Sequence, residues 1–332
     1  MSDPADEPVE TVDVDIRGWV EKARADPQLH RDRQVTEIVL AAIGLSKSLQ
    51  ETLVLKGGTL MAIAFGSNRV TGDVDFTSLV PPDGFETLLK TELDAKLEPA
   101  AIKLGYLDLR CRVQGIKRYP RSDNFEGADF PALELRVGSA ERGTTQEVAL
   151  AEGRASRTLY IEISFRDQVY AFQDLYLEKP EVAVQAFTLE ELIAEKFRAL
   201  LQQPIRKRNR RQDVFDIAYL IETNTIDDAS RAKILTTLVD KCRSRGIDPN
   251  ADSLDNPEVS KRAQKEWETL RLELRDLPPF GDQFVKVAAL ITAFPGADVR
   301  ASTLRPDQAA AATPRVAPLG QAMRFGTFRR RR

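Results

Sequence analysis

The sequence predicts an α+β protein, in which one mixed sheet with flanking helices is followed by an all-helical half. Between residues 106 and 172, hydrophobic residues recur mostly at every second position, which is typical of strands. After Pro180 they recur at helical spacing almost to Thr292. The composition, with 42% hydrophobic and 30% charged residues, is that of a globular chain able to bury a sizeable core.

The first half begins with an acidic segment, residues 1–15, which carries six acids and no base and is expected to be a disordered arm. Residues 16–180 are expected to form the α/β domain with N-terminal helices. Its first helices are predicted at 16–25 and 33–47, and a short apolar strand at 52–55 then leads into a helix up to Gly66. The remaining elements are a strand around 73–76, a helix over 84–104, and strands at 107–113, 132–137 and 158–165.

The second half, residues 181–295, is expected to be a helical domain that completes the site. Its helices are predicted at 189–202, 213–223, 229–245, 257–275 and 281–292. The last segment, 296–332, carries eight arginines against two aspartates and has no folding periodicity. It is therefore expected to be a basic disordered tail.

Several classes of protein are excluded by what the chain lacks. No apolar run approaches the roughly 18 to 20 residues that span a bilayer, and the acidic start is unlike a signal peptide, so we expect a cytoplasmic protein without a membrane partner. Cys111 and Cys242 have no metal-binding spacing, and His30 is the single histidine. Histidine-dependent hydrolysis and multi-histidine metal centres are thereby disfavoured, which leaves carboxylates, Lys and Arg for phosphate and magnesium chemistry.

The first candidate motif is Lys56-Gly57-Gly58-Thr59, between the predicted strand and helix. A glycine pair lets backbone N–H groups approach a phosphate, and the start of a helix adds a favourable partial charge. The motif alone is weak, because it lacks the spacing of a P-loop and such turns are often only tight turns.

The second motif is Asp73-Val74-Asp75 on the next strand. Residues two apart on a strand point to the same face, so the two carboxylates lie side by side. Their charges repel, and a divalent cation between them removes the conflict. The alternative, two exposed strand acids, is common for an arbitrary Asp-x-Asp.

A two-metal transfer of a phosphoryl group calls for a third carboxylate on a neighbouring strand, to bind the second metal ion and to deprotonate or orient the attacking hydroxyl. Glu162, in the strand Leu159 to Phe165, is the preferred residue, and Glu134 is its rival. The glutamate of this pair that is not the third carboxylate would be an ordinary solvent-facing residue of its strand.

A helix around Lys196 and a basic loop follow, and seven basic residues with no acid lie between Lys196 and Arg211. Lys196 could reach a triphosphate as a point charge, and Arg208 and Arg211 could donate paired hydrogen bonds to phosphate oxygens. A charge run is usually a solvated face, but this one would repel itself without phosphate or solvent.

Together these motifs resemble the abortive-infection AbiEii family, nucleotidyltransferase-like toxins of type IV toxin–antitoxin systems within the DNA polymerase β-like superfamily. The resemblance rests on Lys-Gly-Gly-Thr-Leu, on Arg69-Val-Thr-Gly-Asp-Val-Asp-Phe, on the helix Leu-Ile-Ala-Glu-Lys-Phe-Arg-Ala-Leu, and on Arg-x-x-Asp-x-x-Asp-Ile. It covers about Leu53 to Leu220, and the order and spacing of the motifs are specific as a set. The expected fold is therefore a polymerase β-like nucleotidyltransferase sheet.

The resemblance also implies roles for individual residues. Asp73 and Asp75 correspond to the metal-binding pair, and Lys196 and Asp213 complete the nucleotide site. Asp216 is expected to hold the helical half in place. The nucleotide-binding positions would be Lys56, Gly57, Gly58, Thr59, Arg69, Arg208 and Arg211. The chain departs from the family at Gln212, where a charged residue is frequent, and in its two terminal arms.

The function expected from residues and resemblance is Mg²⁺-dependent (or Mn²⁺-dependent) transfer of a nucleotide from a nucleoside triphosphate to an RNA, with tRNA as the implied acceptor. An antitoxin protein is the implied partner. The alternatives are transfer to a protein or small molecule, and a non-catalytic binding module of the same fold. No aromatic interleaving typical of a base-stacking platform is evident, so no sequence preference can be read.

Overall fold

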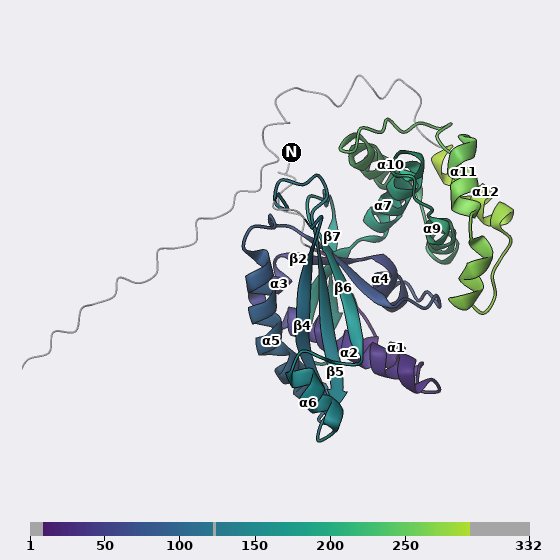
Figure 1. Cartoon of the computed structure of the whole chain (residues 1–332). Coiled ribbons are helices and arrows are strands. Elements are labelled where there is room, and N and C mark those ends of the chain that lie inside the picture. Colours follow the sequence, from purple (N-terminus) through teal and green to yellow (C-terminus); the bar gives the residue numbers. More distant parts are fainter. Residues whose placement is uncertain (1–8, 122–123, 293–332) are drawn as a thin grey trace, which may run out of the picture. The chain divides into compact units, whose positions relative to one another are not determined.

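The computed structural model describes residues 9–121 and 124–292, and its centre is an eight-stranded mixed sheet (Figure 1). The strand order is β1-β7-β8-β2-β3-β6-β5-β4. The strands are β1 (Thr11–Asp13), β2 (Leu53–Lys56), β3 (Asp73–Ser78), β4 (Leu109–Tyr119), β5 (Ala132–Glu141), β6 (Thr158–Ser164), β7 (Phe172–Leu177) and β8 (Val182–Phe187).

The helices before β8 pack mostly on the sheet, whereas those after it pack mostly on one another, α7 contacting α9 and α10. Figure 1 shows the later helices gathered beyond one end of the strands. The helices are α1 (Ile16–Glu21), α2 (Pro27–Gly44), α3 (Lys47–Gln50), α4 (Gly57–Ala64), α5 (Phe85–Lys103), α6 (Thr145–Ala151), α7 (Leu189–Leu201), α8 (Gln203–Arg206), α9 (Arg211–Thr223), α10 (Asp228–Arg243), α11 (Pro257–Gln264), the 3-10 helix η1 (Trp267–Leu272) and α12 (Phe280–Ile291).

Alternation along the central strands separates a core face from a polar face. In β3, Val74 and Phe76 are buried with at most 1% exposure, and Asp73 and Asp75 alternate with them on the opposite face. In β6, Ile161 is buried in the same way. The polar residues of both strands therefore share one face of the sheet.

The register aligns five charged residues in one row across five strands. Lys56 pairs with Asp75, Asp75 with Glu162, Glu162 with Glu134, and Glu134 with Lys117. Side chains at directly paired positions project to the same face and lie close together. The row places three carboxylates between two lysines.

The structure differs from the expected organisation at two strands, β1 and β8, which lie in the same half of the sheet. Thr11–Asp13, expected within a disordered arm, forms β1, because its backbone pairs in parallel with β7. Val182–Phe187, expected in the helical half, forms β8, which pairs with β2 and β7. The sheet therefore extends beyond Pro180, and both predicted halves belong to one compact unit. Residues 1–8 of the predicted arm and the whole predicted tail lie outside the described residues.

Candidate active site

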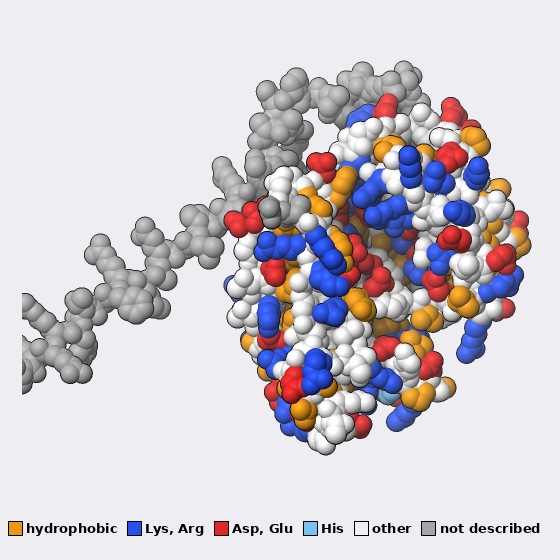
Figure 2. Space-filling model, viewed as in Figure 1, with side chains coloured by type: hydrophobic (Ala, Val, Ile, Leu, Met, Phe, Trp, Pro, Cys, Tyr) orange, Lys and Arg blue, Asp and Glu red, His pale blue; other side chains and the backbone are white. Residues whose placement is uncertain are grey.

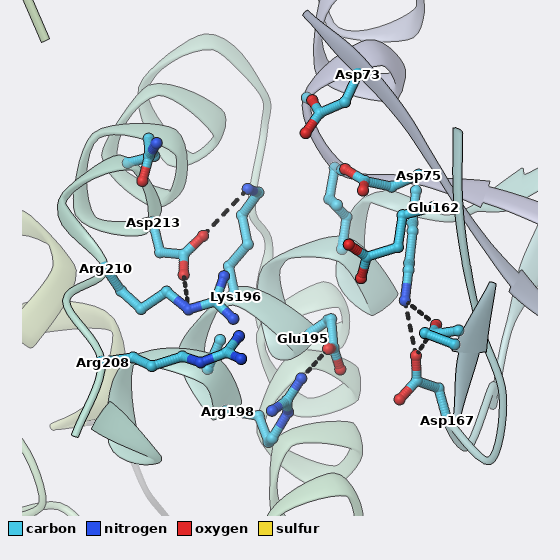
Figure 3. Close-up of a pocket in the computed structure, with 18 of the residues that line it drawn as sticks. Asp73, Asp75, Glu162, Asp167, Glu195, Lys196, Arg198, Arg208, Arg210 and Asp213 are labelled. Carbon is cyan, nitrogen blue, oxygen red and sulfur yellow. Dashed lines mark hydrogen bonds and ion pairs between the residues drawn. The ribbon is translucent and has the colours of Figure 1, made fainter. Parts of the chain in front are cut away.

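A cavity of about 600 Å³ is lined by residues of the polar sheet face and of the helices α7 and α9 with the loop before α9. In Figure 2, red side chains lie in this hollow and blue side chains crowd its rim. Figure 3 shows carboxylates from the strands facing basic side chains from the helices. The cavity thus brings opposite charges from the two halves of the chain to one place.

The glycine pair lies at the junction of β2 and α4, as the sequence predicts. Gly57 has a φ of +72°, and a Cβ there would lie 2.0 Å from Oδ2 of Asp75. A Cβ on Gly58 would meet Thr71 Oγ1 at 2.7 Å. Both positions require glycine, because a side chain would displace the residues that line the cavity. No side chain caps the start of α4, so its first N–H groups are available to an anion.

Asp73, Asp75 and Glu162 all line the cavity and point into it from the strands (Figure 3). Asp73 accepts a hydrogen bond from Thr71 Oγ1 at 2.9 Å. Within the described residues, Asp75 and Glu162 have neither a hydrogen bond nor an ion pair. Burial and the neighbouring charge of Asp73 together raise the pKa of Asp75 to about 7, although Lys56 opposes the change. The adjacent carboxylates of Asp75 and Glu162 therefore have no directly bonded partner among the described residues.

Glu134 lines the same cavity but already has partners. Its carboxylate lies 3.3 Å from the Lys117 ammonium and accepts a hydrogen bond from Tyr119 Oη at 3.4 Å. These contacts support the choice of Glu162 over Glu134 as the third carboxylate of the site.

The donor set fits a divalent ion that is completed by its substrate. No group of three or more His, Cys, Asp or Glu in the part of the chain that the structure describes is arranged to hold an ion by itself. Mg²⁺ usually takes one or two protein carboxylates together with water and the phosphates of its substrate. Asp73 and Asp75 provide such a pair.

Lys196 and Arg69 line the cavity, but both are bound to Asp216. The Lys196 ammonium lies 2.6 Å from Asp216 and 3.4 Å from Asp213, and Arg69 contacts Asp216 with two nitrogens, at 3.0 and 3.1 Å. Arg69 also contacts Glu273 at 2.9 Å. Asp216, with no exposed surface, therefore links the loop before β3 to α7 and α9.

The basic loop before α9 directs alternate arginines into the cavity. Arg206, Arg208 and Arg210 line it, whereas Arg211 turns away and contacts Glu273 at 3.0 Å. Among the described residues, no carboxylate lies within 4.0 Å of Arg206 or Arg208. Partial burial lowers the pKa of Arg206, and the neighbouring arginines lower it further. The loop is thus an anion-binding surface whose members Arg206 and Arg210 the sequence analysis did not single out.

Besides Arg69 and Arg211, two further predicted nucleotide-binding residues, Thr59 and Lys56, make contacts within the protein. Thr59 is buried and donates from Oγ1 to the carbonyl of Asp73 at 2.8 Å, so its side chain fixes the start of β3. Lys56 lies 2.7 Å from Asp167, which also contacts Arg245 at 3.0 Å. Lys56 and its neighbours hold the pKa of Asp167 well below its usual range, although burial opposes this.

Asp167 was not predicted, because nothing in its local sequence distinguishes it. The residue lies just after β6, and its partners Lys56 and Arg245 come from positions far apart in the chain. Only the strand register could have indicated this contact.

The model of the nucleotidyltransferase AbiEii toxin family of type IV toxin–antitoxin systems matches residues 39–289, which include every site residue described above. The chain belongs to the AbiEii nucleotidyltransferase toxin family. As an AbiEii protein it is a nucleotidyltransferase, and its family implies a nucleoside triphosphate substrate and an antitoxin partner. The confirmed fold class is the mixed α/β architecture of these enzymes.

Solved structures similar to this AbiEii protein include MenT4, a nucleotidyltransferase toxin from Mycobacterium tuberculosis. Identity is 15%, the TM-score is 0.51, and the match covers 86% of this chain and 92% of MenT4. JHP933 from Helicobacter pylori has 14% identity and a TM-score of 0.44 over 80% of this chain and 91% of its own. The likeness to MenT4 shows the fold. No curated protein matches the chain. Across the described helices, none is both long and apolar enough to span a membrane.

Proposed function

We propose that this AbiEii protein transfers a nucleotide from a nucleoside triphosphate to an RNA acceptor, with a divalent ion held by Asp73 and Asp75. One observation carries the proposal. Asp75 and Glu162 are adjacent in the charged row of the sheet, and neither has a hydrogen bond or an ion pair in the described chain, although each faces a wall of arginines. Such an arrangement stabilises a ligand that brings both a cation and phosphates.

The triphosphate would lie between the glycine turn and the basic loop. Backbone N–H groups at Gly57 and Gly58 favour phosphate oxygens, and Arg208 and Arg210 line the opposite wall. Bound Mg²⁺ at Asp73 and Asp75 would offset the charge on the α-phosphate and orient the attacking oxygen. Lys196 is already neutralised by Asp213 and Asp216, so its role is to position α9 and to set the local charge.

In the proposed step, the oxygen of an acceptor hydroxyl forms a bond to the α-phosphorus. The bond from this phosphorus to the oxygen bridging to the β-phosphorus breaks, and pyrophosphate leaves with that electron pair. Glu162 would accept the proton of the attacking hydroxyl, a role supported by its position next to Asp75 without a hydrogen bond or ion pair among the described residues. Arg208 and Arg210 stabilise the negative charge of the leaving pyrophosphate.

RNA is the proposed acceptor because the basic surface is larger than one triphosphate needs. Arg206, Arg208 and Arg210 all line the cavity, and Arg206 is without a carboxylate partner. Phosphates of a polynucleotide supply favourable contacts for such a surface.

The test incubates purified protein with total RNA and each labelled nucleoside triphosphate in turn, with and without Mg²⁺. We expect label in one class of RNA, and none with Asp73→Ala. As a matched control, Asp94→Ala removes an aspartate outside this cavity that pairs with Lys90, and should retain transfer. Label in protein or in a small molecule instead of RNA would show that the acceptor belongs to one of those two classes. If the protein bound no triphosphate, the remaining interpretation would be a non-catalytic binding module.

A further inference from the structure

Two half-exposed aromatic rings lie at the far side of the cavity from the glycine turn. Tyr119 is 38% exposed and Phe130 is 40% exposed, and both line the cavity. The strand register places Tyr119 on the face of the sheet that carries the carboxylates. Tyr119 pairs with Ala132, two residues along β5 from Glu134, and its hydroxyl reaches Glu134. The two rings lie in one cavity together with charged side chains, so both are accessible to a ligand bound there.

Guanidinium groups accompany these rings. The Cζ atoms of Arg206 and Arg245 lie 4.5 and 4.4 Å from the centre of the Phe130 ring. Arg245 forms an ion pair with Asp167 at 3.0 Å, which fixes this guanidinium group to the segment just after β6. Arg206 contacts the ring and has no carboxylate partner among the described residues. We call Tyr119, Phe130, Arg206 and Arg245 the aromatic–arginine rim.

The rim lies at a distance suited to the acceptor and not to the triphosphate. Phe130 precedes β5, so it is two strands away from Asp75 and four residues along from Glu134. Two strand spacings of about 4.8 Å across the sheet and four rises of about 3.4 Å along it put Phe130 roughly 17 Å from Asp75. Nucleotides preceding the reactive end of a polynucleotide would lie there.

We infer that the aromatic–arginine rim binds the unpaired nucleotides at the end of a single-stranded RNA acceptor, an inference that rests on the proposed function. Aromatic rings and guanidinium planes stack on unpaired bases, and Arg206, which has no carboxylate partner among the described residues, is available to a phosphate between them. Bases inside a duplex are paired and stacked on one another, so a double-stranded end offers no free base to the rim. An acidic protein segment would use the arginines but not the rings.

The four residues of the rim could not be recognised as a cluster from the sequence, because they lie far apart along the chain. Tyr119 and Phe130 flank the turn between β4 and β5, whereas Arg206 and Arg245 follow α7 and α10. Neither Tyr119 nor Phe130 lies in the basic run from Lys196 to Arg211 that the sequence analysis singled out.

The test measures binding of a labelled oligoadenylate of about ten nucleotides, within the usual site sizes of single-strand grooves. The same oligonucleotide annealed to oligouridylate is the duplex probe. We expect the single strand to bind more tightly than the duplex. Phe130→Ala should weaken single-strand binding roughly 5- to 100-fold, and Phe130→Trp should restore it. Tyr119→Ala is the second variant, and Tyr170→Ala, which removes a half-exposed ring outside the cavity lining, should bind like the wild type.

Transfer assays on the same proteins separate the two proposals. Phe130→Ala should raise the KM for acceptor without raising the KM for the triphosphate. Three results would contradict the proposed role of the rim. They are equal binding of single strand and duplex, an unchanged affinity in both ring variants, and competition by oligoglutamate at equal charge. Normal single-strand binding by the wild type, with no label transferred to any RNA, would leave the rim standing and contradict the proposed function.

Discussion

At the scale of single residues, the conflict of charge at Asp75 is the informative feature of the site. The Asp-x-Asp spacing predicted two carboxylates on one face, and Asp73 and Asp75 do line the same cavity. Spacing could not predict the neighbour Glu162 with certainty, because that contact depends on which strands pair and in which register. Nor could it predict that Lys56 would be bound by Asp167.

The Asp75→Asn variant should be more stable than the wild type in the absence of metal. The pKa of Asp75 is raised to about 7 in the folded protein, above its value near 4 in an unfolded chain. Folded-state stability is therefore lost as the pH rises from about 4 to 7, by up to about 4 kcal/mol. Urea unfolding in EDTA at pH 8 and pH 5 measures the gain in stability, and we expect a larger gain at pH 8 than at pH 5, because only part of the loss has occurred at pH 5. A less stable variant at pH 8 would contradict this interpretation.

Glu162→Gln and Glu134→Gln should have unequal effects on turnover. Glu162 is unengaged beside Asp75, so its loss should lower kcat roughly 100-fold. Glu134 is occupied by Lys117, and its substitution should change kcat only a few-fold. Steady-state transfer with saturating triphosphate and RNA distinguishes them. A larger loss in Glu134→Gln would reverse the assignment.

At the scale of elements, α7 is the helix that connects the site to the helical half. Its Lys196 faces Asp216 on α9, and its Glu195 and Glu191 pair with Lys241 on α10, at 3.3 and 2.7 Å. The helical period predicted α7 within one residue of its observed end. Its partners were not predictable, because a period identifies a polar face and not what it contacts. β7 and β8 were missed because short strands beside Pro180 gave too few alternations.

Glu195 should make the fold sensitive to acid. Burial would raise the pKa of Glu195, but Arg198 and Lys241 lower it to about 2. Its contribution is therefore complete above the unfolded pKa near 4.5 and is lost as the pH falls toward 2, by about 3 kcal/mol. Glu195→Gln should lower the free energy of unfolding at pH 7 and flatten its decline between pH 4.5 and 2, measured by urea unfolding.

The matched control for Glu195 is an exposed pair. Glu258 contacts Arg262 at 2.7 Å, and its side chain is 42% exposed. Glu258→Gln should change stability by less than about 1 kcal/mol at either pH, because solvent screens such pairs. Equal losses in both variants would show that α7 derives no special stability from its buried ion pairs.

At the scale of the whole molecule, the active site exists only because the helical half covers the polar face of the sheet. The sequence predicted a catalytic half and a helical half that completes its site, and the cavity draws residues from both. The boundary near Pro180 was misplaced, since β8 belongs to the sheet. The positions of Arg206 and Arg210 also required the folded loop, because only the three-dimensional path shows which arginines of a basic run turn inward.

RNA binding should depend on salt through the inward arginines. Arg206→Ala should weaken binding of single-stranded RNA and reduce the slope of log affinity against log salt concentration by about 1. Arg271→Ala removes an exposed arginine on η1 that contacts Glu268, away from the cavity, and should leave the slope unchanged. Titrations at several salt concentrations provide the comparison, and equal slopes in the two variants would exclude a phosphate contact at Arg206.

The most direct measurement is anomalous diffraction from crystals grown with Mn²⁺ and a triphosphate that cannot be cleaved between its α and β phosphates. The account predicts an ion bound by oxygens of both Asp73 and Asp75, at roughly 2.2 Å, with the triphosphate against Gly57 and Gly58. An ion and triphosphate bound elsewhere, or a triphosphate that leaves these carboxylates without a metal, would contradict it.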